Sequence, residues 1–253
     1  MYFKNVNEYK NVKINKKNKS QIDIITNKIA LNENDETNYN ERGILFDEIG
    51  EYKKAIDDYT KAIELFEQYD EAYNNRGLAY ESLGEYEKAI EDYNKALKIH
   101  SSNEDVYYNR AISYQNLGMY NEAVNDFSKA IQLNSEEVDF FYNRALCYEA
   151  LGNYQYAIND YTKAIELDCE DEELYSCRAI CFEKACEYEK AIYDYSKVLN
   201  FDKENTDALF NRGVCYEKLK KYDNAKKDYA KVISIDKNDN EAKIRLDLMN
   251  KQM

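Results

Sequence analysis

Residues Tyr73–Leu97 read YNNRGLAYESLGEYEKAIEDYNKAL, and the chain repeats this stretch several times with small changes. In its first half, an apolar or small residue recurs every three or four positions, which predicts one buried face of a helix: Tyr73, Gly77, Tyr80 and Leu83. Gly84 interrupts this pattern, and a second apolar stripe follows over residues 86–97. The stretch therefore predicts two antiparallel helices joined by a short turn.

An arginine sets the period of the repetition. Six arginines stand 34 residues apart without an insertion or deletion: Arg42, Arg76, Arg110, Arg144, Arg178 and Arg212. Loops between independent elements vary in length, so a constant period predicts that each copy packs on the next in the same way. The expected copies are residues 36–69, 70–103, 104–137, 138–171, 172–205 and 206–239.

These positions resemble the tetratricopeptide repeat. Both patterns place an aromatic residue, Gly or Ala four residues later, another aromatic residue three positions on, and then Gly, Tyr and Ala within 34 residues. The resemblance covers residues 36–239 and implies an all-α, right-handed superhelical solenoid of antiparallel helix pairs. Tyr, Phe or Leu stands where the family usually has Trp, and Arg where it has Leu. The family's proline near the end of each repeat is missing, so we expect the second helices to run on or fray.

The two ends of the chain differ from its middle. Residues 19–35 carry isoleucines at helical spacing and are expected to form a degenerate half-repeat helix. Residues 240–253 are expected to form a C-terminal capping helix over the sixth copy. We expect residues 1–18, which are rich in lysine, to be a basic mobile segment.

The net charge of the chain and its distribution indicate which classes of binding partner to expect. The formal net charge is −14, and by count residues 36–205 sum to −20 whereas residues 1–28 sum to +5. Binding to DNA or RNA depends mostly on Lys and Arg, so we expect no nucleic-acid partner. A basic or neutral protein or peptide suits the acidic middle better. The sequence shows neither a long apolar run nor a secretory signal, so we expect a cytoplasmic protein that does not enter a membrane.

Each arginine has an acidic counterpart sixteen residues later: Asp58, Asp92, Asp126, Asp160, Asp194 and Asp228. In an antiparallel helix pair this offset places the two residues at about the same height. We expect each Arg to pair with the Asp of its own copy or with that of the preceding copy, and we interpret these residues as structural. A lysine three residues after each Asp is a competing surface partner.

The first helices of such a stack would line its concave side, where we expect a ligand. Amides stand immediately before four of the arginines, tyrosines two before, and acids five before: Asn75, Asn109, Asn143 and Asn211; Tyr108 and Tyr142; Glu71, Asp105, Asp139 and Glu173. A row of amides can bind the backbone of an extended peptide, and this row resembles the asparagine ladder of some tetratricopeptide superhelices. Alternatively, each Asn ties its helix to a neighbour. A second row of acids stands five residues after the arginines, interrupted by Gln115: Asp47, Glu81, Glu149, Glu183 and Glu217. The acids of both rows either favour Lys or Arg in a ligand or form a solvated rim.

The resemblance implies a protein interaction module that binds an extended, basic or neutral segment of another protein. The alternative is a regulatory or targeting scaffold subunit that docks an enzyme through its convex face or ends. Acids stand where the two-carboxylate clamp of chaperone-binding members needs cations, so we expect no such clamp. The single histidine, His100, lacks a triad, and the sequence contains no Gly-rich phosphate loop. We therefore expect no enzyme activity, no cofactor, no metal site and no small-molecule substrate.

Overall fold

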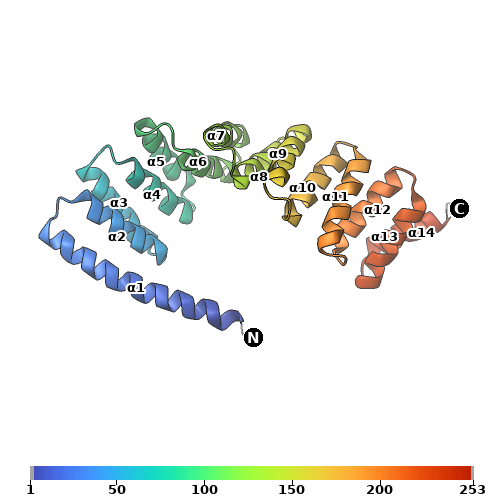
Figure 1. The fold of residues 1–253 in the computed structure, drawn as a ribbon, viewed down its shortest axis with the longest axis horizontal. Helices are drawn as coiled ribbons and strands as arrows, with labels where there is room; N and C mark the ends of the chain where they lie inside the picture. The colour runs from blue at the N-terminus through green and yellow to red at the C-terminus, as the bar shows by residue number, and fades with distance from the viewer. Residues whose placement is uncertain (1–2, 252–253) are drawn as a thin grey trace. The chain divides into compact units, whose positions relative to one another are not determined.

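The computed structural model describes the backbone of residues 3–251 and the side chains of residues 17–250. In this part of the chain every element is a helix, and Figure 1 shows the helices following one another as hairpins. Their bounds are α1 (Phe3–Leu31), α2 (Glu36–Glu48), α3 (Tyr52–Leu65), α4 (Asp70–Ser82), α5 (Tyr86–Ile99), α6 (Glu104–Asn116), α7 (Tyr120–Leu133), α8 (Val138–Ala150), α9 (Tyr154–Leu167), α10 (Glu172–Lys184), α11 (Tyr188–Phe201), α12 (Thr206–Lys218), α13 (Tyr222–Ile235) and α14 (Asn240–Lys251).

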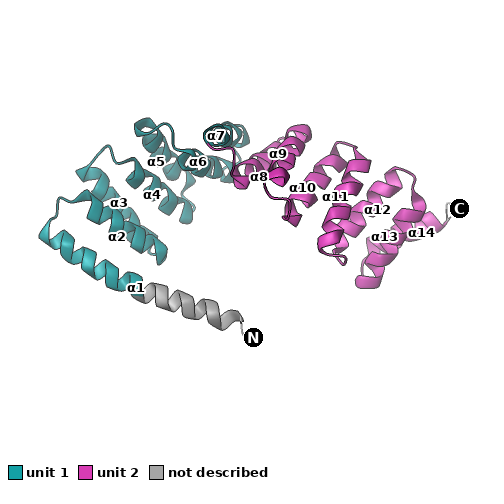
Figure 2. Ribbon diagram, in the orientation of Figure 1, with its two compact units in different colours: residues 1–133 teal, residues 134–253 magenta. Residues whose placement is uncertain are grey.

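The helices belong to two compact units, Met1–Leu133 and Asn134–Met253 (Figure 2). Within each unit, every helix packs against the next one in sequence. In the first unit the first helices of successive pairs, α2, α4 and α6, also contact one another. Each expected 34-residue copy holds one helix pair, from α2 and α3 to α12 and α13. The fold is therefore all-α, with sequential packing of helix pairs.

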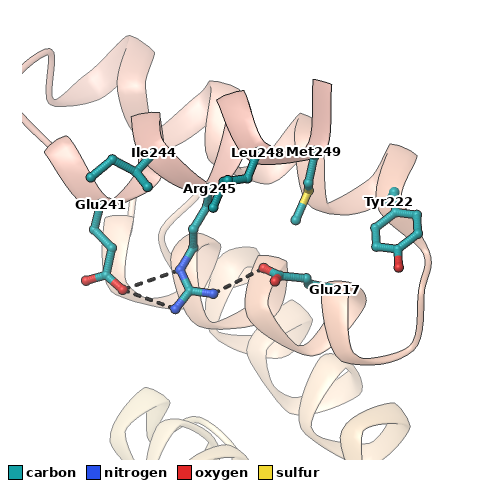
Figure 3. A pocket seen from close by; sticks show the side chains of 7 residues that line it. All are labelled: Glu217, Tyr222, Glu241, Ile244, Arg245, Leu248 and Met249. Carbon is teal, nitrogen blue, oxygen red and sulfur yellow. Dashed lines mark hydrogen bonds and ion pairs between the residues drawn. The ribbon is translucent and has the colours of Figure 1, made fainter. Parts of the chain in front are cut away.

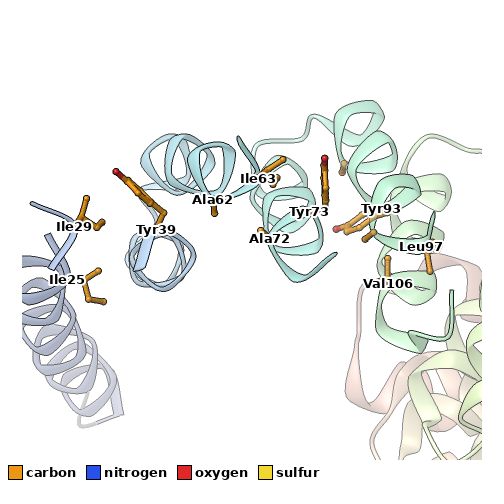
Figure 4. Packing of buried hydrophobic residues seen from close by; sticks show 12 residues of the cluster. Ile25, Ile29, Tyr39, Ala62, Ile63, Ala72, Tyr73, Tyr93, Leu97 and Val106 are labelled. Atoms are coloured by element: carbon orange, nitrogen blue, oxygen red, sulfur yellow. The ribbon is translucent and has the colours of Figure 1, made fainter. Parts of the chain in front are cut away.

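The ends add one helix each. The expected half-repeat lies on α1, whose Ile25 and Ile29 are buried, and Figure 4 shows them facing Tyr39 of α2. On α14, Ala242 and Met249 are buried. Residues 1, 2, 252 and 253 and the side chains of residues 3–16 and 251 lie outside the described part of the chain. The mobility expected for residues 1–18 stays a prediction.

Small residues let the two helices of each pair approach closely. A Cβ atom added to Gly77 of α4 would lie 2.5 Å from Cε1 of Tyr93 on α5. The ring of Tyr93 is fully buried. A large aromatic residue therefore fills the space that glycine or alanine leaves on the facing helix. The equivalent residues in the other copies are equally enclosed: Tyr59, Phe127, Tyr161, Tyr195 and Tyr229.

The expectation that the second helices run on was wrong. All six end at the same place in the repeat, 23 residues after the arginine. An Asn or Asp just beyond the helix takes over the role of proline in several turns, because its side chain accepts a hydrogen bond from the backbone N–H two residues later. The acceptors are Asn134, Asp168, Asp202 and Asp236, and Asn32 does the same after α1. These local turns end the helices without a fixed φ angle.

Candidate functional site

The six Arg–Asp pairs form inside each copy. Every arginine donates two parallel hydrogen bonds to the aspartate sixteen residues later, from Nε and Nη2, at 2.6–2.8 Å. The pairs are well enclosed: in the fifth copy the side chain of Arg178 is 12% exposed and that of Asp194 is 0% exposed. The competing lysines are engaged elsewhere in two copies, where Lys61 and Lys163 pair with a glutamate on their own helix.

The same arginines also reach the preceding helix. In five copies Nη1 donates a hydrogen bond of 2.6–3.1 Å to a side chain sixteen residues earlier: Thr26, Thr60, Asn94, Thr162 and Ser196. In most copies the guanidinium lies over aromatic rings three residues before and four after it, for example 5.8 Å from those of both Tyr175 and Phe182. Each of these five arginines therefore joins its own helix pair to the preceding helix, a link that we did not predict although these polar residues recur with the same period.

We use the term first-helix face for the residues one, two and five positions before each arginine and two positions after it. Its most accessible charges are the acids five positions before, all of which are exposed: Glu71, Asp105, Asp139, Glu173 and Asp207. They lie in the first turn of their helices, where a negative charge is stabilised by the helix dipole. The face therefore presents a row of carboxylates to solvent in each unit.

The amides of the first unit tie neighbouring helices together. Asn75 and Asn109 each donate from Nδ2, at 3.2 Å, to Oδ1 of an Asn on the preceding first helix, Asn40 and Asn74 respectively. Within the described residues, the Oδ1 atoms of Asn75 and Asn109 have no hydrogen-bond donor. The tie that we considered as an alternative is thus present, yet it leaves a row of acceptors that can receive N–H groups of a ligand.

The amides of the second unit differ. Asn143 donates to the backbone carbonyl of Asp139 at 2.8 Å, one turn earlier on α8. Asn211 is partly exposed on α12. Cys177 takes the amide position on α10, and burial raises the pKa of its thiol to about 11, so the thiol stays protonated at neutral pH.

The two tyrosines of the face have packing partners of their own. The ring of Tyr108 lies 5.7 Å from that of Phe127, and the ring of Tyr142 lies 6.1 Å from that of Tyr161. The Tyr142 hydroxyl donates to Glu173 at 2.7 Å. Burial, together with this hydrogen bond, raises the pKa of Tyr142. These rings cover the core and leave one side partly exposed.

An aliphatic row, which we did not single out from the sequence, completes the face. An Ile, Leu or Val stands two residues after every arginine, each only partly buried: Ile44, Leu78, Ile112, Leu146, Ile180 and Val214. Ile180 is 36% exposed. The row could have been found from its 34-residue spacing. It places apolar side chains on the same helices as the exposed acids.

The acids five residues after each arginine do not belong to this accessible face. All are partly buried, and three accept a hydrogen bond from the hydroxyl of the enclosed tyrosine of their own copy: Glu149, Glu183 and Glu217. Glu81 instead accepts one from Ser113 of the next copy. Burial raises the pKa of Glu81, although the bond from Ser113 acts in the opposite direction. We had expected these acids to flank a ligand, and the structure places them between helices.

Glu81→Gln should raise stability at pH 7 by up to roughly 1 kcal/mol. Because the pKa of Glu81 is higher in the folded than in the unfolded chain, its ionisation disfavours folding at neutral pH. This loss of stability disappears as the pH falls through the pKa of Glu81 in the folded chain. Urea unfolding between pH 4 and pH 7 would show the gain at pH 7 shrinking towards the acidic end. The third copy already has Gln115 at this position, and a loss of stability in Glu81→Gln would contradict the argument.

Two open pockets lie at the ends of the helix series. One, of about 390 Å³, is lined by α1 and α2, with Ile24 and Ile44 among its apolar residues. The other, of about 330 Å³, is bounded by α12, the start of α13 and α14. Figure 3 shows its Arg245 between Glu241 and Glu217, which it contacts at 3.1 Å each. Arg245 is the one arginine of the pocket and is paired with two carboxylates.

Within the described residues, no group of three or more His, Cys, Asp and Glu side chains is arranged to hold a metal ion. No described helix combines the length and the apolar character that crossing a bilayer requires.

The family models that match this sequence agree with the helix pairs described above. A model of the tetratricopeptide repeat matches residues 70–103, 104–137, 138–168 and 206–239, and a second TPR repeat model matches residues 43–84 and 187–220. The chain belongs to the tetratricopeptide repeat family. A search of curated proteins found no match to this TPR chain.

Solved structures of other TPR proteins are similar to this one. The chain is 28% identical to YrrB, described as a TPR protein with an unusual peptide-binding site, with a TM-score of 0.67 over 77% of this chain and 98% of YrrB. Part of a TPR protein from Cytophaga hutchinsonii is 18% identical, with a TM-score of 0.77 over 94% of this chain and 98% of its own. MamA is 22% identical, with a TM-score of 0.64 over 68% and 94%. The last two likenesses show the fold alone.

Proposed function

We propose that this TPR protein is an interaction module that binds an extended segment of a partner protein on its first-helix face. The observation that carries this proposal is the combination of exposed carboxylates, the side-chain oxygens of Asn75 and Asn109 and a partly exposed aliphatic row on the first helices. Backbone N–H groups of an extended segment can donate to the amide oxygens, while apolar side chains contact the aliphatic row. The likeness to YrrB, itself described as having a peptide-binding site, supports this proposal.

The charge of the face selects the chemistry of the segment. Carboxylates favour Lys and Arg and disfavour Asp and Glu in a ligand, because opposite charges attract and like charges repel across an interface. The arginines offer no compensating positive surface, since each is enclosed and paired with an aspartate. The segment is therefore basic or neutral.

A scaffold that docks an enzyme through its second helices or its ends is the second candidate. It is favoured by exposed apolar and aromatic side chains outside the first-helix face. Tyr156 on α9 and Tyr193 on α11 are 60% and 58% exposed, and Ile244 on α14 is 59% exposed. Exposed tyrosines are common anchors in protein interfaces.

Partner capture distinguishes the two candidates. We expect Asn75→Ala with Asn109→Ala to lose the chains that the wild-type protein captures from its native lysate, identified by mass spectrometry. Tyr156→Ser with Tyr193→Ser is the matched pair on the second helices and should keep them. The reverse result would overturn the proposed face, and thermal unfolding of both variants would show that neither loses its fold.

A further inference from the structure

The first-helix face and the beginning of the chain carry opposite charges. Residues 1–19 contain six lysines and one acid, Glu8, whereas the exposed row of the face consists of carboxylates alone. This is the most basic stretch of a chain whose net charge is −14. Charge complementarity of this kind steers association and selects partners.

The apolar residues of the stretch also match the face. Phe3, Val6, Val12 and Ile14 are interleaved with the lysines. On the face, the aliphatic row follows the acids by seven residues on every first helix except α2, where Thr37 replaces the acid. Seven residues are about two helical turns, so both rows lie on one side of the helix. A segment that combines lysines with apolar side chains can therefore contact both rows at once.

We propose that the lysine-rich stretch of residues 1–19 in one copy binds the first-helix face of a second copy. This inference rests on the function proposed for that face, and it identifies a second copy of the chain as one binding partner. Self-association and capture of another protein would then compete for the same surface. Occupation of the face would depend on protein concentration and on salt.

The described part of α1 favours the face of a second copy over the chain's own face. The Asn18 amide donates to Glu48, the last residue of α2, at 2.7 Å, and from there α1 runs antiparallel to α2 towards Leu31. The exposed acids lie at the opposite ends of the first helices, in their first turns. A helix of thirteen residues separates the two ends by about 20 Å. The copy's own stretch thus leaves the helix pair at the end remote from the acids.

Sedimentation velocity of the full chain tests the proposal. We expect concentration-dependent association at about 20 mM salt that weakens roughly tenfold or more by about 500 mM salt. Two charge-reversal variants should each be monomeric. In the stretch the changes are Lys10→Glu, Lys13→Glu, Lys16→Glu and Lys17→Glu, and on the face of the second unit they are Asp139→Lys, Glu173→Lys and Asp207→Lys. Mixing these two variants should restore association, because the charges are exchanged between the partners.

A matched control reverses three exposed acids on second helices: Asp57→Lys, Glu91→Lys and Asp223→Lys. This control should associate like the wild type. A wild-type chain that stays monomeric at low salt, a mixture that does not associate, or a control that loses association would each overturn the proposal.

A labelled peptide of alternating Lys and Leu separates this proposal from the function of the face. If the peptide binds the wild-type chain but not the face variant while the wild type stays monomeric, the self-association is wrong and the peptide-binding face stands. Equal binding of the peptide to both chains would contradict both proposals.

Discussion

Asp194→Leu should lower the free energy of unfolding by roughly 3–5 kcal/mol, the cost of leaving a buried charge without its partner. Asp194 is the most enclosed of the six aspartates, and it accepts both parallel bonds of Arg178 at 2.7 and 2.8 Å. Arginine cannot neutralise itself by losing a proton, so the guanidinium of Arg178 would stay charged between its two rings. Urea unfolding followed by circular dichroism measures the loss.

The reciprocal change should be milder. In Arg178→Leu the apolar volume is refilled, and the buried Asp194 carboxyl can take up a proton. A neutral carboxyl costs less to bury than an unpaired guanidinium, so this variant should lose less stability than Asp194→Leu. The double variant Arg178→Leu with Asp194→Leu should lose least, because apolar residues replace the whole pair.

An exposed ion pair provides the control. Glu166→Ala breaks the pair with Lys163, whose side chains are 58% and 51% exposed, and should change stability by less than about 1 kcal/mol. If Asp194→Leu is no more costly than Glu166→Ala, the Arg–Asp pairs do not hold the repeats together.

Gly77→Ala should destabilise the protein by roughly 1–3 kcal/mol, although alanine is the better helix former. Helix propensity alone predicts a gain of about 1 kcal/mol for this change in the interior of α4. The new methyl carbon, however, would lie 2.5 Å from Cε1 and 2.8 Å from Cζ of Tyr93, whose side chain is fully buried. Chemical denaturation would therefore reveal the sign of the effect as well as its size.

Two further variants isolate the cause. Ser82→Ala, at the exposed C-terminal end of the same helix, touches no buried ring and removes only a side-chain hydrogen bond to the Leu78 carbonyl, so it should be nearly neutral. In a Tyr93→Leu background, where the ring is gone, the same Gly77→Ala change should no longer be destabilising. A stabilising Gly77→Ala in the wild-type chain would show that the ring of Tyr93 moves aside freely.

The sequence could predict the helix pairs because one period recurs in every copy. The arginine spacing and the Tyr73, Gly77 and Tyr80 pattern identify the buried faces, and the sixteen-residue offset brings Arg and Asp together. It could not predict where the second helices end, because we took proline as the stop signal and overlooked Asn and Asp, whose side chains form the turns. Nor does the unbroken period mark the division at Leu133.

The candidate site was harder to predict from the sequence. The spacing of residues shows which helix face a side chain lies on, but it does not show which hydrogen bonds that side chain makes. Asn75 was expected on the face and lies there, but its Nδ2 is used by the neighbouring helix. Glu81 was expected to be accessible, and the next helix covers it through Ser113. The hydrogen bonds of Asn75 and of Glu81 both depend on which residue of the adjacent copy is nearest. The packing between copies determines which residue that is.

The hydrogen bond from each arginine to the preceding helix affects how the number of repeats can change in evolution. Because Arg76 bonds to Thr60 as Arg42 bonds to Thr26, the junction made by one unit is chemically interchangeable with that made by its neighbour. Duplication or loss of one in-frame unit of the gene would recreate the same junction at the new boundary. The proposed binding surface can thus lengthen or shorten in evolution by whole repeats, because the contacts at each new boundary are the same.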